Sequence, residues 1–143
     1  MNEQVVVPKW FWVVSILALI WNLLGVGSFI ANVMTTPEAL AALPADQANF
    51  YASTPAWAIA AFAVAVFGGT LGSLGLLLRK SWAKTLFIAS LAGVILQMGH
   101  AFLISNSYEI FGPGGLIMPA MIVVVAILLI WLANVSIRKL WIS

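Results

Sequence analysis

The chain has 143 residues, of which 64% are hydrophobic and only 7% are charged, whereas a soluble domain carries about 25% charged residues. A chain this apolar cannot cover a water-exposed surface, so we expect its side chains to face lipid as well as one another. The net charge of +2 is too small for a nucleic-acid surface, and the lack of cysteine excludes disulfides, thiolate metal sites and cysteine catalysis.

Four stretches are long and apolar enough to cross a bilayer as helices, which takes about 20 residues each. They cover residues 10–34, 55–78, 85–105 and 115–136, and none contains Asp, Glu, Lys or Arg. The first is longer than the apolar part of a signal peptide and lacks a clear cleavage site, so we expect it to be retained. The sequence predicts an all-α fold, an integral membrane four-helix bundle with up-down-up-down topology in a single domain, residues 1–143.

The basic residues predict the orientation of these four spans. They precede the first span, lie between the second and third, or follow the fourth: Lys9, Arg79, Lys80, Lys84, Arg138 and Lys139. The opposite side holds the acids Glu38, Asp46 and Glu109 and no basic residue. Because basic residues collect on the cytoplasmic side of membrane proteins, we expect both termini to be cytoplasmic.

The long first connection carries signals for a short helix. Thr36 suits the N-cap, Pro37 suits the first helical position, and the acid Glu38 suits the positive end of the helix dipole. Pro44 should interrupt this helix, and residues 45–52 can form another turn or two. We therefore predict a short helical cap in the first outer loop.

The second span contains two pairs of small residues at a spacing of four, Gly68 with Gly72 and Gly69 with Ser73. This pattern is typical of close helix contacts in membranes, and a glycine-lined solute path is the functional alternative. The short connection to the third span makes these two helices antiparallel neighbours. The fourth span has no strong polar group until its inner end, so we expect it to be the most lipid-exposed helix.

Two amides fall near the middle of the membrane. Asn22 lies about 18 Å from Trp10 along its helix, and Gln97 lies about 20 Å from Lys84. Polar residues at this depth serve either as interhelical hydrogen bonds or as contacts for a ligand. The sequence leaves both interpretations open and predicts a polar cluster between the first three spans.

His100 is the only histidine, in the outer part of the third span. Tyr108 and Glu109 follow it and are candidate partners, and histidine is the side chain best suited to a proton switch. The alternative is an interfacial histidine bonded to backbone or water. A lone histidine makes no metal site, and neither a catalytic set nor a cofactor motif appears, so we predict that the chain is not an enzyme and holds no metal or cofactor.

Five segments carry a resemblance that covers nearly the whole length: PKWFW (8–12), LIWNLLG (19–25), PEAL (37–40), TPAW (54–57) and SNSYE (105–109). In these segments the chain resembles a group of small bacterial four-span membrane proteins that are often labelled sugar transporters. The resemblance implies a bacterial inner-membrane protein and a transporter-like function. It carries no functional residues over to this sequence.

Two functions remain open from the sequence. In the first, the chain carries or binds a small neutral solute through Asn22, Gln97 and His100, as a homo-oligomer in the lipid bilayer. In the second, it is a non-transporting accessory or structural protein that packs against a larger membrane partner. We expect a neutral solute because the four spans lack charged groups.

Overall fold

A computed structural model describes residues 6–104 and 116–143, and these residues contain helices and no strand. The long helices are α1 (Lys9–Val33), α4 (Ala56–Leu77), α5 (Trp82–Gly99) and α7 (Ile117–Arg138), and a π-helix, η1 (His100–Ile104), continues α5. By length and composition, α1, α4, α7 and the segment Trp82–Leu103 can each cross a membrane. The predicted all-α architecture with four apolar helices is confirmed.

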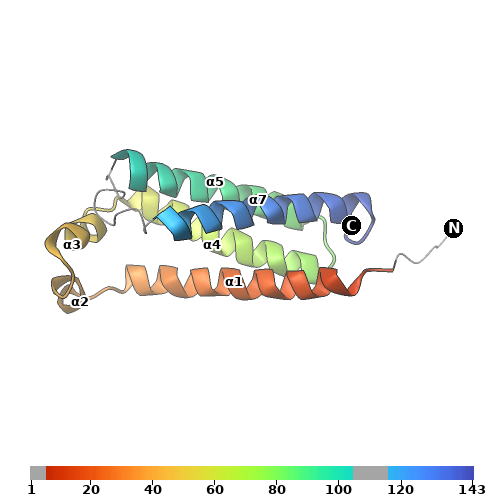
Figure 1. Ribbon diagram of the computed structural model, residues 1–143, viewed down its shortest axis with the longest axis horizontal. Helices are drawn as coiled ribbons and strands as arrows, with labels where there is room; N and C mark the ends of the chain where they lie inside the picture. The colour runs from red at the N-terminus through yellow and green to blue at the C-terminus, as the bar shows by residue number, and fades with distance from the viewer. Residues whose placement is uncertain (1–5, 105–115) are drawn as a thin grey trace.

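The long helices lie side by side, with two short helices at one end and the C-terminus at the other (Figure 1). We call the first end the α3 end. The second is the basic end, because the six Lys and Arg residues lie there, at the start of α1, around the α4–α5 turn and at the end of α7. α5 begins at Trp82, three residues before the predicted start at Thr85.

The first connection folds into α2 (Pro37–Ala41) and α3 (Ala45–Ala52). The Thr36 hydroxyl accepts a hydrogen bond from the backbone N–H of Ala39 at 3.2 Å, and Pro37 is the first residue of α2. Pro44 then separates the two short helices. The start signals read from the sequence therefore operate as helix caps. The position of these helices relative to a membrane surface stays a prediction.

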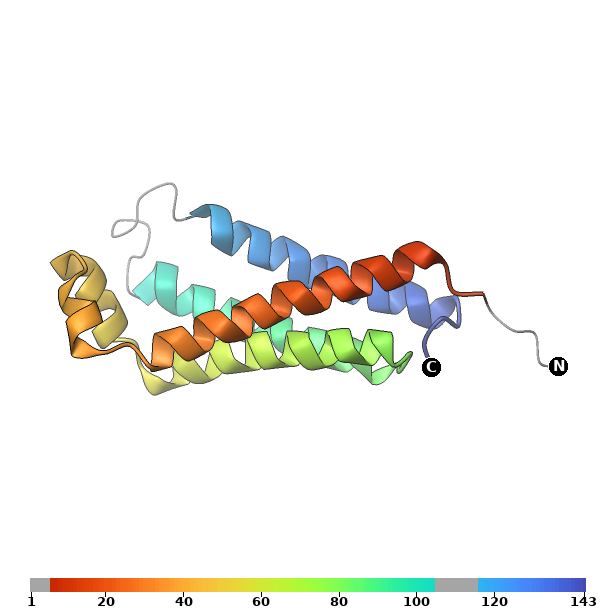
Figure 2. The same cartoon turned by 90° about the horizontal axis from the view of Figure 1, so that it is seen from below.

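The helices pack in the order α1, α4, α5 and α7, and the α4–α5 interface is the most extensive. α1 and α7 approach each other near the basic end and diverge toward the α3 end (Figure 2). α1 buries only 17% of its most apolar stretch, against 33% for α7. The prediction that the fourth span is the most lipid-exposed is therefore wrong. The reason is that α1 packs mainly on α4, whereas buried residues of α7 join the core.

An apolar core closes the basic end of the bundle. Phe11, Phe87, Leu132, Trp141 and Ile142 are buried there, so the chain folds back after α7 to cover the helix ends.

The turn between α4 and α5 and the turn after α7 each contain a non-glycine residue with positive φ, Arg79 at 58° and Leu140 at 61°. The Arg79 side chain donates a hydrogen bond from Nε to the Trp141 carbonyl at 2.8 Å, which joins the two turns.

α4 and α5 approach each other backbone to backbone. A Cβ added at Gly93 would lie 2.6 Å from the carbonyl oxygen of Ala61 and 2.9 Å from the nitrogen of Ala65. A Cβ added at Gly68 would lie 3.2 Å from the carbonyl oxygen of Leu86. Because backbone atoms cannot rotate away as side chains do, glycine is required at Gly93 for this separation of the helices.

This contact predicts that Gly93→Ala destabilises the protein by about 1–3 kcal/mol, the usual cost of overpacking. Gly27→Ala is the matched control, because a Cβ added at Gly27 meets nothing within 4 Å. Thermal unfolding in detergent, followed by circular dichroism, measures both variants. Equal stability of the two variants would contradict the close backbone contact.

Candidate ligand-binding cavity

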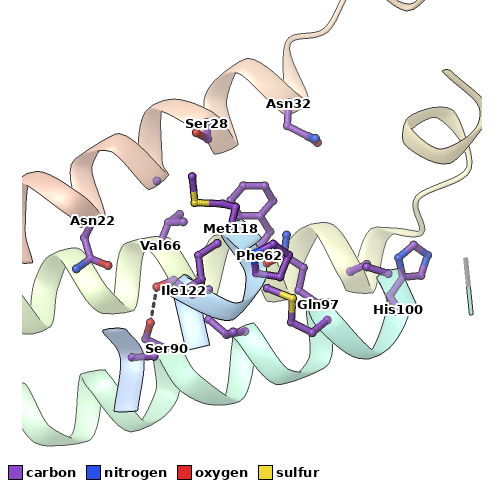
Figure 3. Close-up of a pocket in the computed structure, with 18 of the residues that line it drawn as sticks. Asn22, Ser28, Asn32, Phe62, Val66, Ser90, Gln97, His100, Met118 and Ile122 are labelled. Atoms are coloured by element: carbon purple, nitrogen blue, oxygen red, sulfur yellow. Dashed lines mark hydrogen bonds between the residues drawn. The ribbon is translucent and has the colours of Figure 1, made fainter. Parts of the chain in front are cut away.

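A cavity of about 610 Å³ lies between the diverging parts of α1 and α7, with α4 and α5 as its floor. Figure 3 shows its lining side chains, which come from all four long helices. Most of its wall is apolar, with Phe62, Val66, Val94, Ile122 and Val125 among the lining residues. Polar side chains interrupt this wall at a few points: Asn22, Ser28, Asn32, Thr54, Ser90, Gln97 and His100.

Asn22 marks the deep end of the cavity on α1, and its side chain is only 8% exposed. Its amide nitrogen donates to the Ala18 carbonyl at 2.8 Å and lies 3.4 Å from the Ser73 hydroxyl. These contacts set the orientation of the amide, and its oxygen points toward α4 on the side of Val66 (Figure 3), where it lies against Gly69. Within the described chain, no group donates a hydrogen bond to this oxygen.

Gln97 lies on α5, two turns beyond Ser90, and is half-buried in the cavity wall. No described residue forms a hydrogen bond with its side chain, nor with the side chains of Ser28 and Asn32 on α1. In contrast, the Ser90 hydroxyl donates to the Ala65 carbonyl at 2.6 Å. Within hydrocarbon an amide without a partner is costly, so the half-buried Gln97 amide can gain one from a molecule inside the cavity.

His100 is buried, only 4% exposed, at the first residue of η1. Its ring lies 5.5 Å from the Trp57 ring, edge to face, and 6.2 Å from the Phe50 ring. The proposed partners Tyr108 and Glu109 fall outside the described residues. The histidine thus stands among aromatic rings of α3 and α4 at the α3 end, and it begins a π-helix, a feature that is frequent at functional sites.

The four small residues of α4 face two different helices. Gly68 packs against Leu86 and Ser90 of α5, and Gly72 packs against Phe87. Gly69 and Ser73 face the Asn22 side chain of α1 instead. None of the four lines the cavity, so these residues place the helices around it.

The structure therefore brings Asn22, Gln97 and His100 to one cavity, although no direct hydrogen bond joins the two amides. Sequence reasoning missed the contribution of α7, which adds Met118 and Ile122 to the wall. Apolar residues of a membrane helix look alike whether they face lipid or a cavity, so no sequence signal distinguished them.

Among the described residues that line the cavity there is no Asp, Glu, Lys or Arg, and His100 is the one ionisable side chain of the spans that reaches it. Among the described residues there is also no group of histidine, cysteine and acidic side chains that could hold a metal ion. Amide and hydroxyl groups in an apolar wall suit hydrogen bonding to an uncharged molecule. Comparisons with known protein families, curated proteins and solved structures gave no match.

The contact between Gly69 and Asn22 predicts strong coupling between these positions. A Cβ added at Gly69 would overlap the Asn22 amide oxygen, so Gly69→Ala should destabilise the protein by about 1–3 kcal/mol. In an Asn22→Ala background the space is vacant, and most of this cost should vanish. A double-mutant cycle of unfolding free energies measures the coupling. An identical cost in both backgrounds would argue against the packing described here.

Proposed function

We propose that this protein is a membrane-embedded binder, or carrier, of a small neutral molecule that occupies the cavity between α1 and α7. The observation that carries the proposal is that the side chains of Asn22 and Gln97 line one cavity, while the Asn22 oxygen and the Gln97 amide have no hydrogen-bond partner among the described residues. A bound molecule with a hydroxyl or amide group supplies those partners. In the unliganded protein, water in the cavity supplies these hydrogen-bond partners instead.

The dimensions of the cavity support a ligand rather than a packing defect. Its volume of about 610 Å³ lies within the range of about 300–1,000 Å³ that is usual for small-molecule sites. A wall that is mainly apolar with a few polar groups is also typical of such sites. The described wall offers a charged ligand no Asp, Glu, Lys or Arg, which favours a neutral one. The resemblance to small four-span proteins labelled sugar transporters agrees with this class.

A carrier requires access to the cavity from both sides of the membrane. The core of Phe11, Phe87, Trp141 and Ile142 blocks the basic end, so transport needs a rearrangement of that end. We propose that the protein works as a homo-oligomer, in which a neighbouring copy supports this rearrangement. A binder without transport needs no such rearrangement.

We propose the bacterial inner membrane as the location, with the basic end and both termini in the cytoplasm. The chain has no cysteine, so single cysteines report topology directly. Ser53→Cys at the α3 end should react with a membrane-impermeant maleimide in intact cells, because that end faces outward. Ser81→Cys at the basic end should react only after lysis. The reverse pattern would overturn the orientation.

A second candidate function is that of an accessory protein that packs against a larger membrane partner. The exposed surface of α1 favours it, since α1 buries the smallest share of its residues among the four long helices. In this case the unpaired polar groups of the cavity would meet a partner helix instead of a ligand.

A thermal-shift screen of the protein in lipid nanodiscs tests the proposed function, with uncharged sugars, polyols, amides and long-chain alcohols beside charged analogues. We expect stabilisation by a neutral compound, and weaker binding by about threefold for each hydrogen bond lost in Asn22→Leu or Gln97→Leu. Thr70→Val is the control, because Thr70 bonds only to its own helix and does not line the cavity.

The screen separates the two candidate functions. Stabilisation that both leucine variants leave unchanged would argue against this site. A single stoichiometric partner that co-purifies, with no response to any compound, would favour the accessory function.

A further inference from the structure

We propose that the cavity opens sideways into the hydrocarbon between α1 and α7, and that its ligand is a neutral amphiphile that enters from the bilayer. This inference rests on the proposed function and specifies the class of its ligand. Such a ligand has an uncharged apolar body and at least one hydroxyl or amide group.

The opening is seen in residues that both line the cavity and face the outside of the bundle. Leu24 and Ser28 on α1 and Met118 on α7 all line the cavity, yet Leu24 is 67% exposed and Met118 is 55% exposed. Ser28 is exposed as well. α1 and α7 do not pack extensively against each other, and they diverge at this level (Figure 2). The two helices therefore form the rim of a lateral opening.

The depth of this rim places it against lipid. Leu24 lies 15 residues after Lys9, which is about 22 Å along α1 at a rise of 1.5 Å per residue. The hydrocarbon core of a bilayer is about 30 Å thick, so Leu24 lies within it when Lys9 lies at one boundary. Met118 lies 20 residues before Arg138, about 30 Å along α7, so it marks the outer boundary of the same core and the opening extends inward from there to Leu24. A molecule that enters beside Leu24 comes from the acyl-chain region.

The chemistry of the wall defines the molecule that fits. The Asn22 oxygen requires a donor such as a hydroxyl or an N–H group, and the Gln97 amide offers both a donor and an acceptor. Between them Phe62, Val66 and Ile122 present an apolar surface. Around Asn22 and Gln97 the described wall holds no Asp, Glu, Lys or Arg, so a carboxylate or an ammonium group between these amides would be buried without a counter-ion, at a cost that disfavours it. A neutral amphiphile satisfies both the amides and the apolar wall.

Photo-labelling in phosphatidylcholine nanodiscs tests the inference. The probe is a long-chain alcohol with a diazirine in its chain, compared with the carboxylate and the plain alkane of equal length. Mass spectrometry of digested protein locates the adducts. We expect the alcohol to label Phe62, Val66 or Ile122 about tenfold more than the carboxylate, given the cost of an unpaired charge in the membrane.

Two matched pairs of variants test the route and the polar contact. Met118→Trp should block the rim and abolish the cavity adducts, whereas Met121→Trp, which lies on the same helix and does not line the cavity, should leave them unchanged. Ser28→Trp and its control Ala31→Trp repeat the comparison on α1. Gln97→Leu should remove the preference for the alcohol over the alkane.

Other outcomes overturn the inference in distinguishable ways. Adducts confined to outward residues such as Val124 would show that the probe samples only the lipid boundary. Labelling lost equally in Met118→Trp and Met121→Trp would show that a second copy, not a lipid-facing opening, covers this surface. If a water-soluble compound instead binds with the same affinity in wild type and Met118→Trp, the proposed function stands and the lateral entry fails. If no compound stabilises the protein in the thermal-shift screen and no probe labels the cavity, both the proposed function and the lateral entry are rejected.

Discussion

The close backbone contact between α4 and α5 is the constraint on which the rest of the structure depends. Glycine at position 93 lets the two helices approach until backbone meets backbone, and Gly68 and Gly72 extend this contact. α1 then packs on α4, and α7 packs on α5. Because α1 and α7 attach to different members of the central pair, they meet only near the basic end, and the space between their other halves becomes the cavity.

The polar side chains within the spans differ in whether they have a hydrogen-bond partner inside the protein. The hydroxyls of Ser73, Ser90 and Thr70 donate to backbone carbonyls, which satisfies them without any ligand. The Asn22 oxygen and the Gln97 amide have no such partner among the described residues, and both side chains line the cavity. In water this difference would mean little, because solvent would bond to either kind. In a membrane it singles out the amides that line the cavity as groups able to bond to another molecule, although the buried Ser15 hydroxyl also lacks a partner and lies away from the cavity.

The two ends of the bundle have different roles in this arrangement. At the basic end the chain after α7 covers the helix ends, and Arg79 ties it to the α4–α5 turn through the Trp141 carbonyl. At the α3 end α1 and α7 diverge, and His100 lies among the aromatic rings of α3 and α4. A bundle that is closed at one end and parted at the other is suited to hold a molecule that comes from the side.

The sequence by itself determined the four apolar helices, the antiparallel pair that became α4 and α5, and the caps of α2, because these follow from hydropathy, loop length and local hydrogen bonding. It also singled out Asn22, Gln97 and His100, since polar residues stand out in an apolar span. Only the tertiary structure decided that α1, not α7, is the most exposed helix, that Gly93 makes the closest backbone contact, and that Met118 and Ile122 of α7 line the cavity. The physical reason is that lipid and protein are equally apolar neighbours, so hydropathy cannot tell which face of a membrane helix contacts lipid and which contacts another helix.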